Sequence, residues 1–199
     1  MTGLPWDASY LNGAAPWDIG QPQPAIARLA SEGGFMGPVL DVGCGTGENT
    51  LLIASLGLQV VGMDVAETAI AIAREKAKNS GLDIEFAVAD AFHLNQLRRS
   101  FDTVLDCGLF HTFNSEERTE YLASLASAIK HNGTLYVLCF SDDGPGTGPH
   151  PVRQEELKAA FNPGTGWNIV AIRPERILTR YRDRNGAPAW LATMKVLDI

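Results

Sequence analysis

The stretch PVLDVGCGTGENTLL, residues 38–52, decides the fold of this chain. Its apolar first half predicts a buried strand over 39–42, which leads into glycines at positions 43, 45 and 47 and then into a helix. A strand, a glycine-rich turn and a helix in this order begin a doubly wound α/β sheet, whose ligands bind beyond the carboxyl ends of the strands. Asp41 lies two residues before the first glycine, so the ligand has to suit a carboxylate near that turn.

The rest of the chain repeats the alternation of strands and helices. Short β-branched or apolar runs predict four further strands, over 59–64, 84–90, 101–107 and 133–140. Helical spacing and end signals predict helices over 67–81, 115–133 and 153–161. We expect Ser115 to start the second of these helices and His131, Asn132 and Gly133 to end it.

The last third of the chain predicts a loop and a closing hairpin. Residues 141–152 are rich in Gly and Pro and predict a mobile loop above the sheet. Two apolar runs, 167–181 and 187–199, flank the turn sequence RDRNGAP and predict the hairpin. The pattern as a whole predicts an α/β, Rossmann-like, doubly wound sheet of seven strands. It is mostly parallel with an antiparallel last strand, and helices cover both faces.

Composition limits the function classes. The 199 residues are 45% hydrophobic and 20% charged, so we expect one domain over 1–199. The formal charge of -7 argues against binding to nucleic-acid phosphates. The apolar runs are shorter than the roughly 20 residues that span a bilayer, and the start MTGLPWDASY has no signal-peptide pattern. We therefore expect a cytoplasmic protein without a membrane partner.

The three cysteines give no sign of a metal site. Cys44, Cys107 and Cys139 lie in apolar or glycine-rich strand contexts, without the paired spacing of zinc ligands. We expect reduced thiols and no metal.

The charges near the glycines distinguish between two kinds of ligand. A dinucleotide fingerprint needs the spacing GxGxxG, but here the third glycine comes one residue early and Glu48 follows it. Glu48 and Asp41 would both repel a diphosphate, whereas they would attract an ammonium or sulfonium group. The polar end of the ligand is therefore expected to be cationic.

These residues resemble the first motif of class I methyltransferases that use S-adenosylmethionine (SAM). The resemblance implies that Asp64 binds the ribose hydroxyls and that Asp90 holds the adenine amine, with Ala91 and Phe92 against the ring. The stretch FDTVLDCGLFHTF, 101–113, resembles the fourth-strand motif that borders the transferred methyl group. The implied cofactor-binding residues are Trp17, Asp41, Gly43, Cys44, Gly45, Thr46, Gly47, Asp64, Val65, Asp90, Ala91, Phe92, Asp106 and Cys107.

The amino-terminal segment carries a second resemblance. Its two Trp-Asp pairs, Tyr10 and several glycines and prolines resemble the lid of the thiopurine, thiol and halide methyltransferases, and of bacterial enzymes that methylate toxic hydroxy-heterocycles. The matching residues are Trp6, Asp7, Tyr10, Gly13, Pro16, Trp17, Asp18 and Gly20. The resemblance implies that 1–24 fold over the cofactor, although Ser9 stands where that branch has Arg or Lys. A stiff arm packing two indoles on the core is the alternative.

Methyl transfer needs alignment of the nucleophile, methyl carbon and sulfur more than it needs covalent help. His111 and Tyr10 are the candidate catalytic residues for an acceptor that needs a base, and His150 is a further possibility. A packing or capping role for His111 stays open. Phe92, Phe110, Phe113 and Trp17 are candidates for an apolar acceptor pocket, and Cys107 for a small wall residue.

The sequence thus predicts a SAM-dependent enzyme that methylates an O, S or N atom of a small aromatic, heterocyclic or thiol molecule, with S-adenosylhomocysteine as product. We expect a monomer or weak homodimer that binds no nucleic acid. Two alternatives stay open, a SAM-binding sensor without catalysis and, less favoured by the glycine spacing, an NAD-dependent oxidoreductase.

Overall fold

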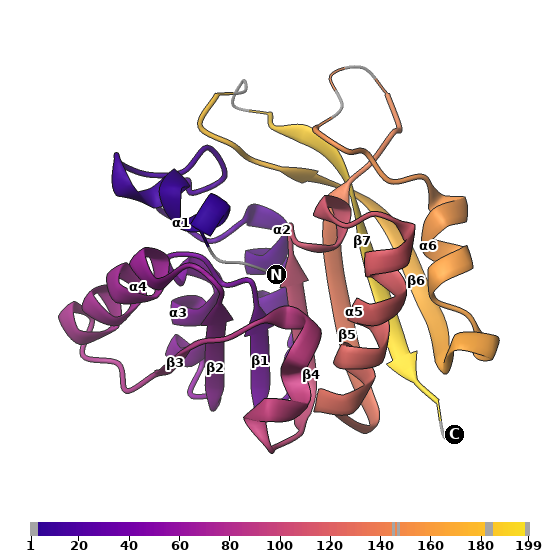
Figure 1. Ribbon diagram of the computed structural model, residues 1–199, viewed down its shortest axis with the longest axis horizontal. Coiled ribbons are helices and arrows are strands. Elements are labelled where there is room, and N and C mark those ends of the chain that lie inside the picture. Colours follow the sequence, from indigo (N-terminus) through magenta and orange to yellow (C-terminus); the bar gives the residue numbers. More distant parts are fainter. Residues whose placement is uncertain (1–3, 145, 147, 182–184, 198–199) are drawn as a thin grey trace.

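The central sheet has the predicted doubly wound order. The computed structural model describes residues 4–144, 146, 148–181 and 185–197, and its strands form a 7-stranded sheet in the order β3-β2-β1-β4-β5-β7-β6 (Figure 1). The strands are β1 (Val39–Val42), β2 (Val60–Asp64), β3 (Glu85–Val88), β4 (Phe101–Cys107), β5 (Ile129–Phe140), β6 (Trp167–Ile177) and β7 (Ala187–Val196). The chain builds outward from β1 to β3 and then returns to place β4 on the other side of β1, so the switch in strand order lies between β1 and β4.

The direction of the strands changes only near the end of the chain. The pairs of β1 with β2, β1 with β4, β2 with β3 and β4 with β5 are parallel. Strand β7 is antiparallel to both β5 and β6, which confirms the predicted hairpin. Residues 182–184 of its turn, 145 and 147 of the loop above the sheet, and 198–199 of the last apolar run lie outside the described residues.

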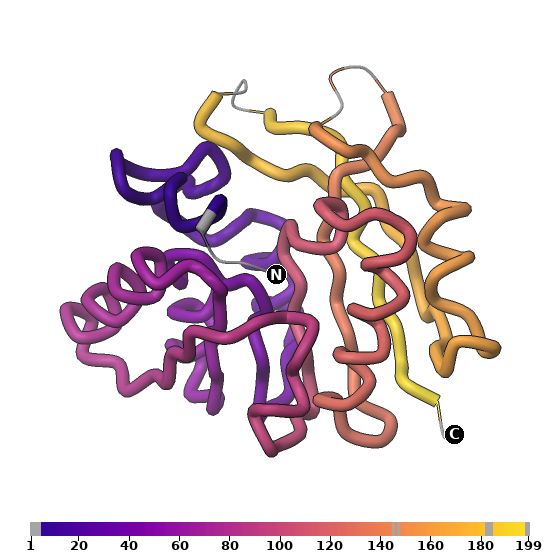
Figure 2. The backbone as a smooth tube through the Cα atoms, viewed as in Figure 1, coloured from indigo at the N-terminus to yellow at the C-terminus, as the bar shows by residue number. Residues whose placement is uncertain are grey.

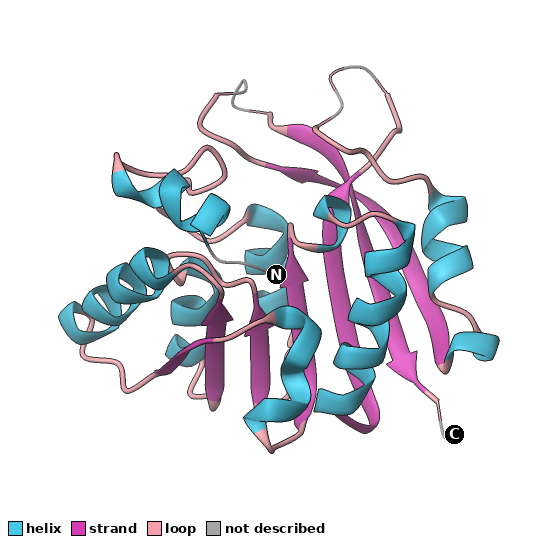
Figure 3. Cartoon of the chain, viewed as in Figure 1, coloured by secondary structure: helices cyan, strands magenta, loops and turns pink. Residues whose placement is uncertain are grey.

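Helices cover both faces of the sheet (Figure 3). The α-helices are α1 (Leu4–Leu11), α2 (Pro24–Ser31), α3 (Glu48–Ser55), α4 (Glu67–Asn79), α5 (Ser115–Ala128) and α6 (Gln154–Ala160). Three short 3-10 helices, η1 (Ala91–Leu97), η2 (Phe110–Thr112) and η3 (Pro163–Thr165), lie in connections. Helices α5 and α6 and η1 pack on one face, and α2 and α3 pack on the other. Helix α1 lies above α4, on the side of the sheet where β1 and β2 end, and contacts α4 through Asp7 (Figure 2).

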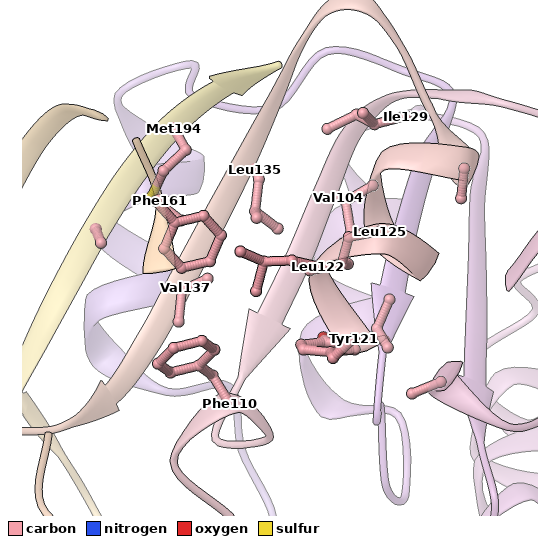
Figure 4. Close-up of a cluster of buried hydrophobic side chains, with 14 of the residues drawn as sticks. Val104, Phe110, Tyr121, Leu122, Leu125, Ile129, Leu135, Val137, Phe161 and Met194 are labelled. Atoms are coloured by element: carbon pink, nitrogen blue, oxygen red, sulfur yellow. The ribbon is translucent and has the colours of Figure 1, made fainter. Parts of the chain in front are cut away.

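The strands are apolar because both of their faces are buried. Successive residues of β5 enter opposite clusters, since Leu135 and Val137 pack toward α5 whereas Tyr136 and Leu138 pack toward α2. Figure 4 shows the first cluster, where Leu122 of α5 lies against the strand side chains. This two-sided burial gives the continuous hydrophobic runs by which the strands were predicted.

The predicted carboxyl-terminal ends of one strand and one helix differ from the structure. The strand over 84–90 ends at Val88, because Asp90 caps η1 by accepting a hydrogen bond from the Phe92 N–H at 3.0 Å. The helix over 115–133 ends at Ala128, because Ile129 is extended and already pairs with β4. His131, Asn132 and Gly133 therefore lie in β5 and do not end the helix.

The start of α5 agrees with the prediction, since the helix begins at Ser115, and the structure adds the residue that caps it. Its cap is Asn114, whose side chain accepts hydrogen bonds from the backbone N–H groups of Glu116 and Glu117. The Glu117 carboxylate in turn accepts from the Asn114 N–H at 2.9 Å, which completes a capping box. Ser115 is the first residue inside the helix.

No helix within the described ranges combines the length and apolarity needed to cross a bilayer.

Asp41 is a buried acid at the centre of the fold. It lies in β1 and its Oδ2 accepts a hydrogen bond from the Thr50 hydroxyl of α3 at 2.6 Å, while Oδ1 has no partner among the described residues. Burial raises the pKa of Asp41 to about 7, against the lowering effect of Thr50 and with help from the nearby carboxylates of Asp64 and Asp106. The charge of Asp41 thus costs the fold free energy.

This raised pKa predicts a pH dependence of stability. Between about pH 4 and about pH 7 the unfolded chain has lost the Asp41 proton and the folded chain still holds it, so the free energy of unfolding falls as pH rises through this window. In Asp41→Asn, which keeps an acceptor for Thr50, we expect this fall to shrink by on the order of 1–3 kcal/mol. Urea unfolding at pH 4.5 and pH 8 measures it. Asp83→Asn, at an exposed position, is the matched control, and an unchanged pH slope in Asp41→Asn would contradict the assignment.

Candidate active site

The strand register brings the sequence motifs to one edge of the sheet. Val42 of β1 lies beside Met63 of β2 and beside Asp106 of β4, and Asp64 lies beside Val88 of β3. The four parallel strands therefore end at the same level, and the loops that follow them surround one space.

The glycine loop folds back onto the end of β2. Gly43, Gly45 and Gly47 all have positive φ, from 55° to 86°, which favours glycine over residues with a side chain. The Gly45 N–H donates to Asp64 Oδ2 at 2.9 Å. A Cβ on Gly45 would lie 3.1 Å from the Tyr10 hydroxyl, so the amino-terminal segment approaches the loop where a side chain is missing.

Asp64 is held in place by backbone groups on both of its carboxylate oxygens. Its second oxygen, Oδ1, accepts from the Ala66 N–H at 2.9 Å, and the residue is almost fully buried. Burial raises the pKa of Asp64, while the hydrogen bonds from Ala66, Gly45 and Val65 lower it. Each carboxylate oxygen keeps a further lone pair, so Asp64 can still accept from a pair of hydroxyls.

The predicted adenine residues separate into two groups. Asp90 and Ala91 line the space at the end of β3. Phe92 is not in the wall, because its ring packs against Phe113 at 4.9 Å and Tyr121 at 6.3 Å. Phe92 and Phe113 therefore belong to the core side of η1 and do not form an acceptor pocket.

Asp106 and Cys107 at the end of β4 also have different roles. The Asp106 carboxylate accepts from the Leu109 N–H at 2.8 Å and from the Tyr121 hydroxyl at 2.9 Å, and it is fully buried. Asp106 thus holds the turn after β4 from the side that faces the core, whereas Cys107 lines the space at the strand ends. Burial raises the pKa of the Cys107 thiol, which keeps it protonated and disfavours a nucleophilic role.

The loops enclose a cavity of about 730 Å3, within the range of about 300–1,000 Å3 that is usual for small-molecule sites. The predicted site residues that line it are Tyr10, Trp17, Gly43, Cys44, Gly45, Thr46, Asp64, Val65, Asp90, Ala91, Cys107 and His111. The predicted residues outside its wall are Asp41, Gly47, Phe92 and Asp106. Asp41 and Asp106 are turned into the fold, and Gly47 faces Ala73, which a Cβ would meet at 3.0 Å. Among the described residues no cluster of His, Cys, Asp and Glu could hold a metal ion.

The amino-terminal segment covers the cavity through specific contacts. Asp7 accepts hydrogen bonds from the Thr68 N–H at 2.7 Å and the Thr68 hydroxyl at 3.0 Å, at the start of α4. The Trp17 ring N–H donates to the Tyr10 hydroxyl at 2.8 Å, and the Trp6 ring meets the Trp17 ring edge-on at 5.8 Å. The two indoles thus pack on each other and on Tyr10 above the glycine loop.

Sequence reasoning missed the residues that fasten this segment to the hairpin. The Gln23 amide forms two hydrogen bonds with the backbone of Leu178, both 2.9 Å long. The Arg180 N–H donates to the Pro16 carbonyl at 2.9 Å. Residues 178–180 follow β6, so two segments far apart in the sequence form one cover. No local pattern indicates such a pairing.

Asp18 was also missed as a site residue, although its Trp-Asp pair was recognised. It lines the cavity and accepts a hydrogen bond from the Thr46 hydroxyl at 2.9 Å. The repetition of the Trp-Asp pair was the signal that could have identified Asp18 as a site residue. The acid of the first pair, Asp7, also accepts a hydrogen bond from a threonine, Thr68 of α4.

The far end of the cavity, beyond β4, is mostly uncharged. Its wall comes from η2, the end of β5, the loop above the sheet and the hairpin, and the lining residues are Leu109, His111, Thr112, Phe140, Pro149, His150, Ile177, Thr179 and Tyr181. Phe110, a predicted pocket residue, is absent from this wall because it is fully buried beside Phe161.

His111 is the ionisable group closest to the core at this end. Its ring lies 4.7 Å from the Phe140 ring, and its Nδ1 is buried without a partner among the described residues. Burial lowers the pKa of His111 to about 4, with smaller contributions from His150 and Arg118. The imidazole is therefore neutral at physiological pH. Burial raises the pKa of Tyr10, helped by the Asp64 charge, so its phenol stays protonated and suits donation better than base catalysis.

Comparison with known proteins identifies the family. The family described as methyltransferase domain matches residues 39–133, which run from the start of β1 into β5. The 2-heptyl-1-hydroxyquinolin-4(1H)-one methyltransferase of Mycobacteroides abscessus is 37% identical over 166 residues, 81% of this chain and 72% of that protein. A probable thiol methyltransferase 2 of Arabidopsis thaliana is 30% identical over 170 residues, 84% of this chain and 75% of that protein.

A solved structure extends the similarity to almost the whole chain. That structure is described with the words "Conversion of a Disulfide Bond into a Thioacetal Group during Echinomycin Biosynthesis". It superposes on this chain with a TM-score of 0.88 at 32% identity. The match covers 99% of this chain and 92% of that one, so it includes the cover as well as the sheet. By its motifs, its fold and these relatives, the chain belongs to the methyltransferase domain family.

Proposed function

We propose that this protein transfers a methyl group from SAM to an oxygen, sulfur or nitrogen atom of a small molecule, and that residues 4–24 act as the cofactor lid. The observation that carries the proposal is one cavity with two different ends. Carboxylates of Asp18, Asp64 and Asp90 surround the end at the glycine loop, and uncharged side chains surround the other.

The residues at the glycine loop fit the donor. SAM supplies a methyl carbon on a positively charged sulfur, next to an amino-acid end and an adenosine. Asp64, with free lone pairs on both oxygens, would accept from the ribose hydroxyls, and Ala91 leaves room for the adenine beside Asp90. Asp41 lies behind the loop, so it would act on the sulfonium only through its field.

The far end favours an acceptor that ionises readily. A neutral His111 with a lowered pKa can orient a hydroxyl or thiol by a hydrogen bond, but it holds a proton poorly. The acceptor is thus expected to be a thiol or an aromatic hydroxy-heterocycle, whose own pKa is low. The relatives named as a hydroxyquinolinone methyltransferase and as a probable thiol methyltransferase support this class.

The remaining parts of the proposal concern the whole chain. We propose that 1–199 work as one domain in the cytoplasm, as a monomer or weak homodimer, without a nucleic-acid or membrane partner. The net charge of -7 supports the exclusion of nucleic acid.

Two measurements test the proposed function. Isothermal titration with SAM is expected to show binding, and no heat at hundreds of micromolar SAM would refute the donor. Labelled SAM, incubated with a panel of thiols, phenols and hydroxyquinolines, is expected to label at least one class. Binding without transfer to any member would favour a SAM sensor instead.

Asp64→Ala is expected to weaken SAM binding at least tenfold, about 1.4 kcal/mol, because the ribose hydroxyls lose a charged acceptor. Titration of a 2′-deoxy analogue of S-adenosylhomocysteine separates this effect from a distorted loop. The missing hydroxyl is expected to weaken binding to the wild type and to leave binding to Asp64→Ala nearly unchanged. Equal losses in both proteins would place the ribose elsewhere.

His111→Ala is expected to lower kcat at least tenfold while the Kd for SAM stays within twofold, because His111 lies beyond the glycine loop. If His111 helps to remove a proton, the loss grows along a series of phenols of rising pKa. Since the pKa of His111 is about 4, wild-type kcat should not change through ionisation of this group between pH 5.5 and pH 8. An equal loss of kcat for every phenol in the series would indicate that His111 has a packing role and takes no part in proton removal.

A further inference from the structure

Lys76 belongs to no motif that was recognised in the sequence, yet it contacts two residues of the cavity wall. It projects from α4, outside the cavity, and its Nζ donates to the Thr46 hydroxyl at 2.7 Å and to Glu48 Oε1 at 2.6 Å. Thr46 belongs to the glycine loop and Glu48 begins α3, so one ammonium joins three elements. Its side chain is 30% exposed and that of Glu48 is 22% exposed, which limits the screening of this ion pair by water.

The hydrogen bond of Thr46 continues toward the lid. A threonine hydroxyl has a single proton, and an ammonium can only donate, so the Thr46 oxygen accepts from Lys76. The proton of Thr46 is then directed at Asp18 Oδ2, 2.9 Å away. Asp18 Oδ1 accepts from the Gly20 N–H at 3.0 Å, which fixes the plane of the carboxylate. We call Lys76, Thr46 and Asp18 the lid relay.

The lid relay also sets the charge at the end of the cavity beside the glycine loop. Asp18 and Glu48 both line the cavity, and without a cation they would leave two negative charges beside the loop. Lys76 compensates the charge of Glu48, so of this pair the carboxylate of Asp18 remains, in addition to that of Asp64 at the end of β2. Compensating Glu48 suits a ligand that carries both an ammonium and a carboxylate, because a further negative charge beside the loop would repel the carboxylate.

We propose that Lys76 is a positioning residue, which acts through Thr46 to hold the lid on the glycine loop and to present Asp18 to the amino-acid end of the donor. This rests on the proposed function for the identity of the donor. The part that concerns the lid does not depend on it, since both contacts of the relay join residues of the protein itself.

The variants remove one link at a time. Lys76→Met keeps the length of the side chain without its charge, and Thr46→Val keeps its shape without the hydroxyl. Thr46→Ser retains the hydroxyl and serves as the rescue. Lys78→Met removes a positive charge from an exposed position of the same helix and is the matched control.

The first measurement is amide hydrogen exchange in the ligand-free protein. Exchange in residues 4–20 is expected to be at least threefold faster in Lys76→Met and Thr46→Val, with no change in β4 or β5. Thr46→Ser and Lys78→Met should match the wild type. Unchanged exchange in Lys76→Met, or equal acceleration in Lys78→Met, would overturn the proposal.

The second measurement is the kinetics of methyl transfer. We expect the KM for SAM to rise at least tenfold in Lys76→Met and Thr46→Val, while kcat at saturating SAM stays within threefold. The double variant should be no more than twofold worse than Lys76→Met, because both changes break one chain. A fall in kcat with unchanged KM would overturn the positioning role. If the wild type neither binds SAM nor transfers methyl, the proposed function fails, and the exchange measurement still decides whether the relay holds the lid.

Discussion

The site depends on the hydrogen bond from the Gly45 N–H to the Asp64 carboxylate. It joins the loop after β1 to the end of β2, so the turn and the acid that we propose to bind two different parts of the donor are fixed to each other. The bond is possible because Gly45 adopts a positive φ and turns its N–H toward β2. The same bare backbone lets Tyr10 approach from above, so both the floor and the cover of the cavity depend on this position.

Carboxylates at this edge of the sheet come at a cost to stability. Burial raises the pKa of Asp41, Asp64 and Asp106, which means that the folded chain disfavours the charged form of each relative to water. Backbone and hydroxyl donors offset part of this cost, and Tyr121 and Thr50 have that role for two of the acids. A fold that binds a cation thus keeps negative potential in its interior, at the expense of its own stability.

The sequence predicts the sheet well because its strands are buried on both faces and its motifs end the strands in order. It predicts helix ends less well, since α5 begins at Ser115 as expected but stops at Ala128, where Ile129 is extended and pairs with β4. Among site residues, Asp64 and Cys107 follow from motif positions. The roles of Gln23, Asp18 and Lys76 do not follow from motifs, because each residue contacts a partner far along the chain. Gln23 contacts Leu178, and both Asp18 and Lys76 contact Thr46. Phe92 was misplaced for a related reason: spacing cannot tell which side of a short helix faces the ligand.

The cover over the cavity is made from both ends of the chain. Gln23 and Arg180 fasten the amino-terminal segment to the residues after β6, and the latter also border the space for the acceptor. A change at residues 178–180 that reshapes the cavity would therefore also disturb the amino-terminal segment above the glycine loop. The wall that η2 supplies can be altered at a greater distance from these contacts.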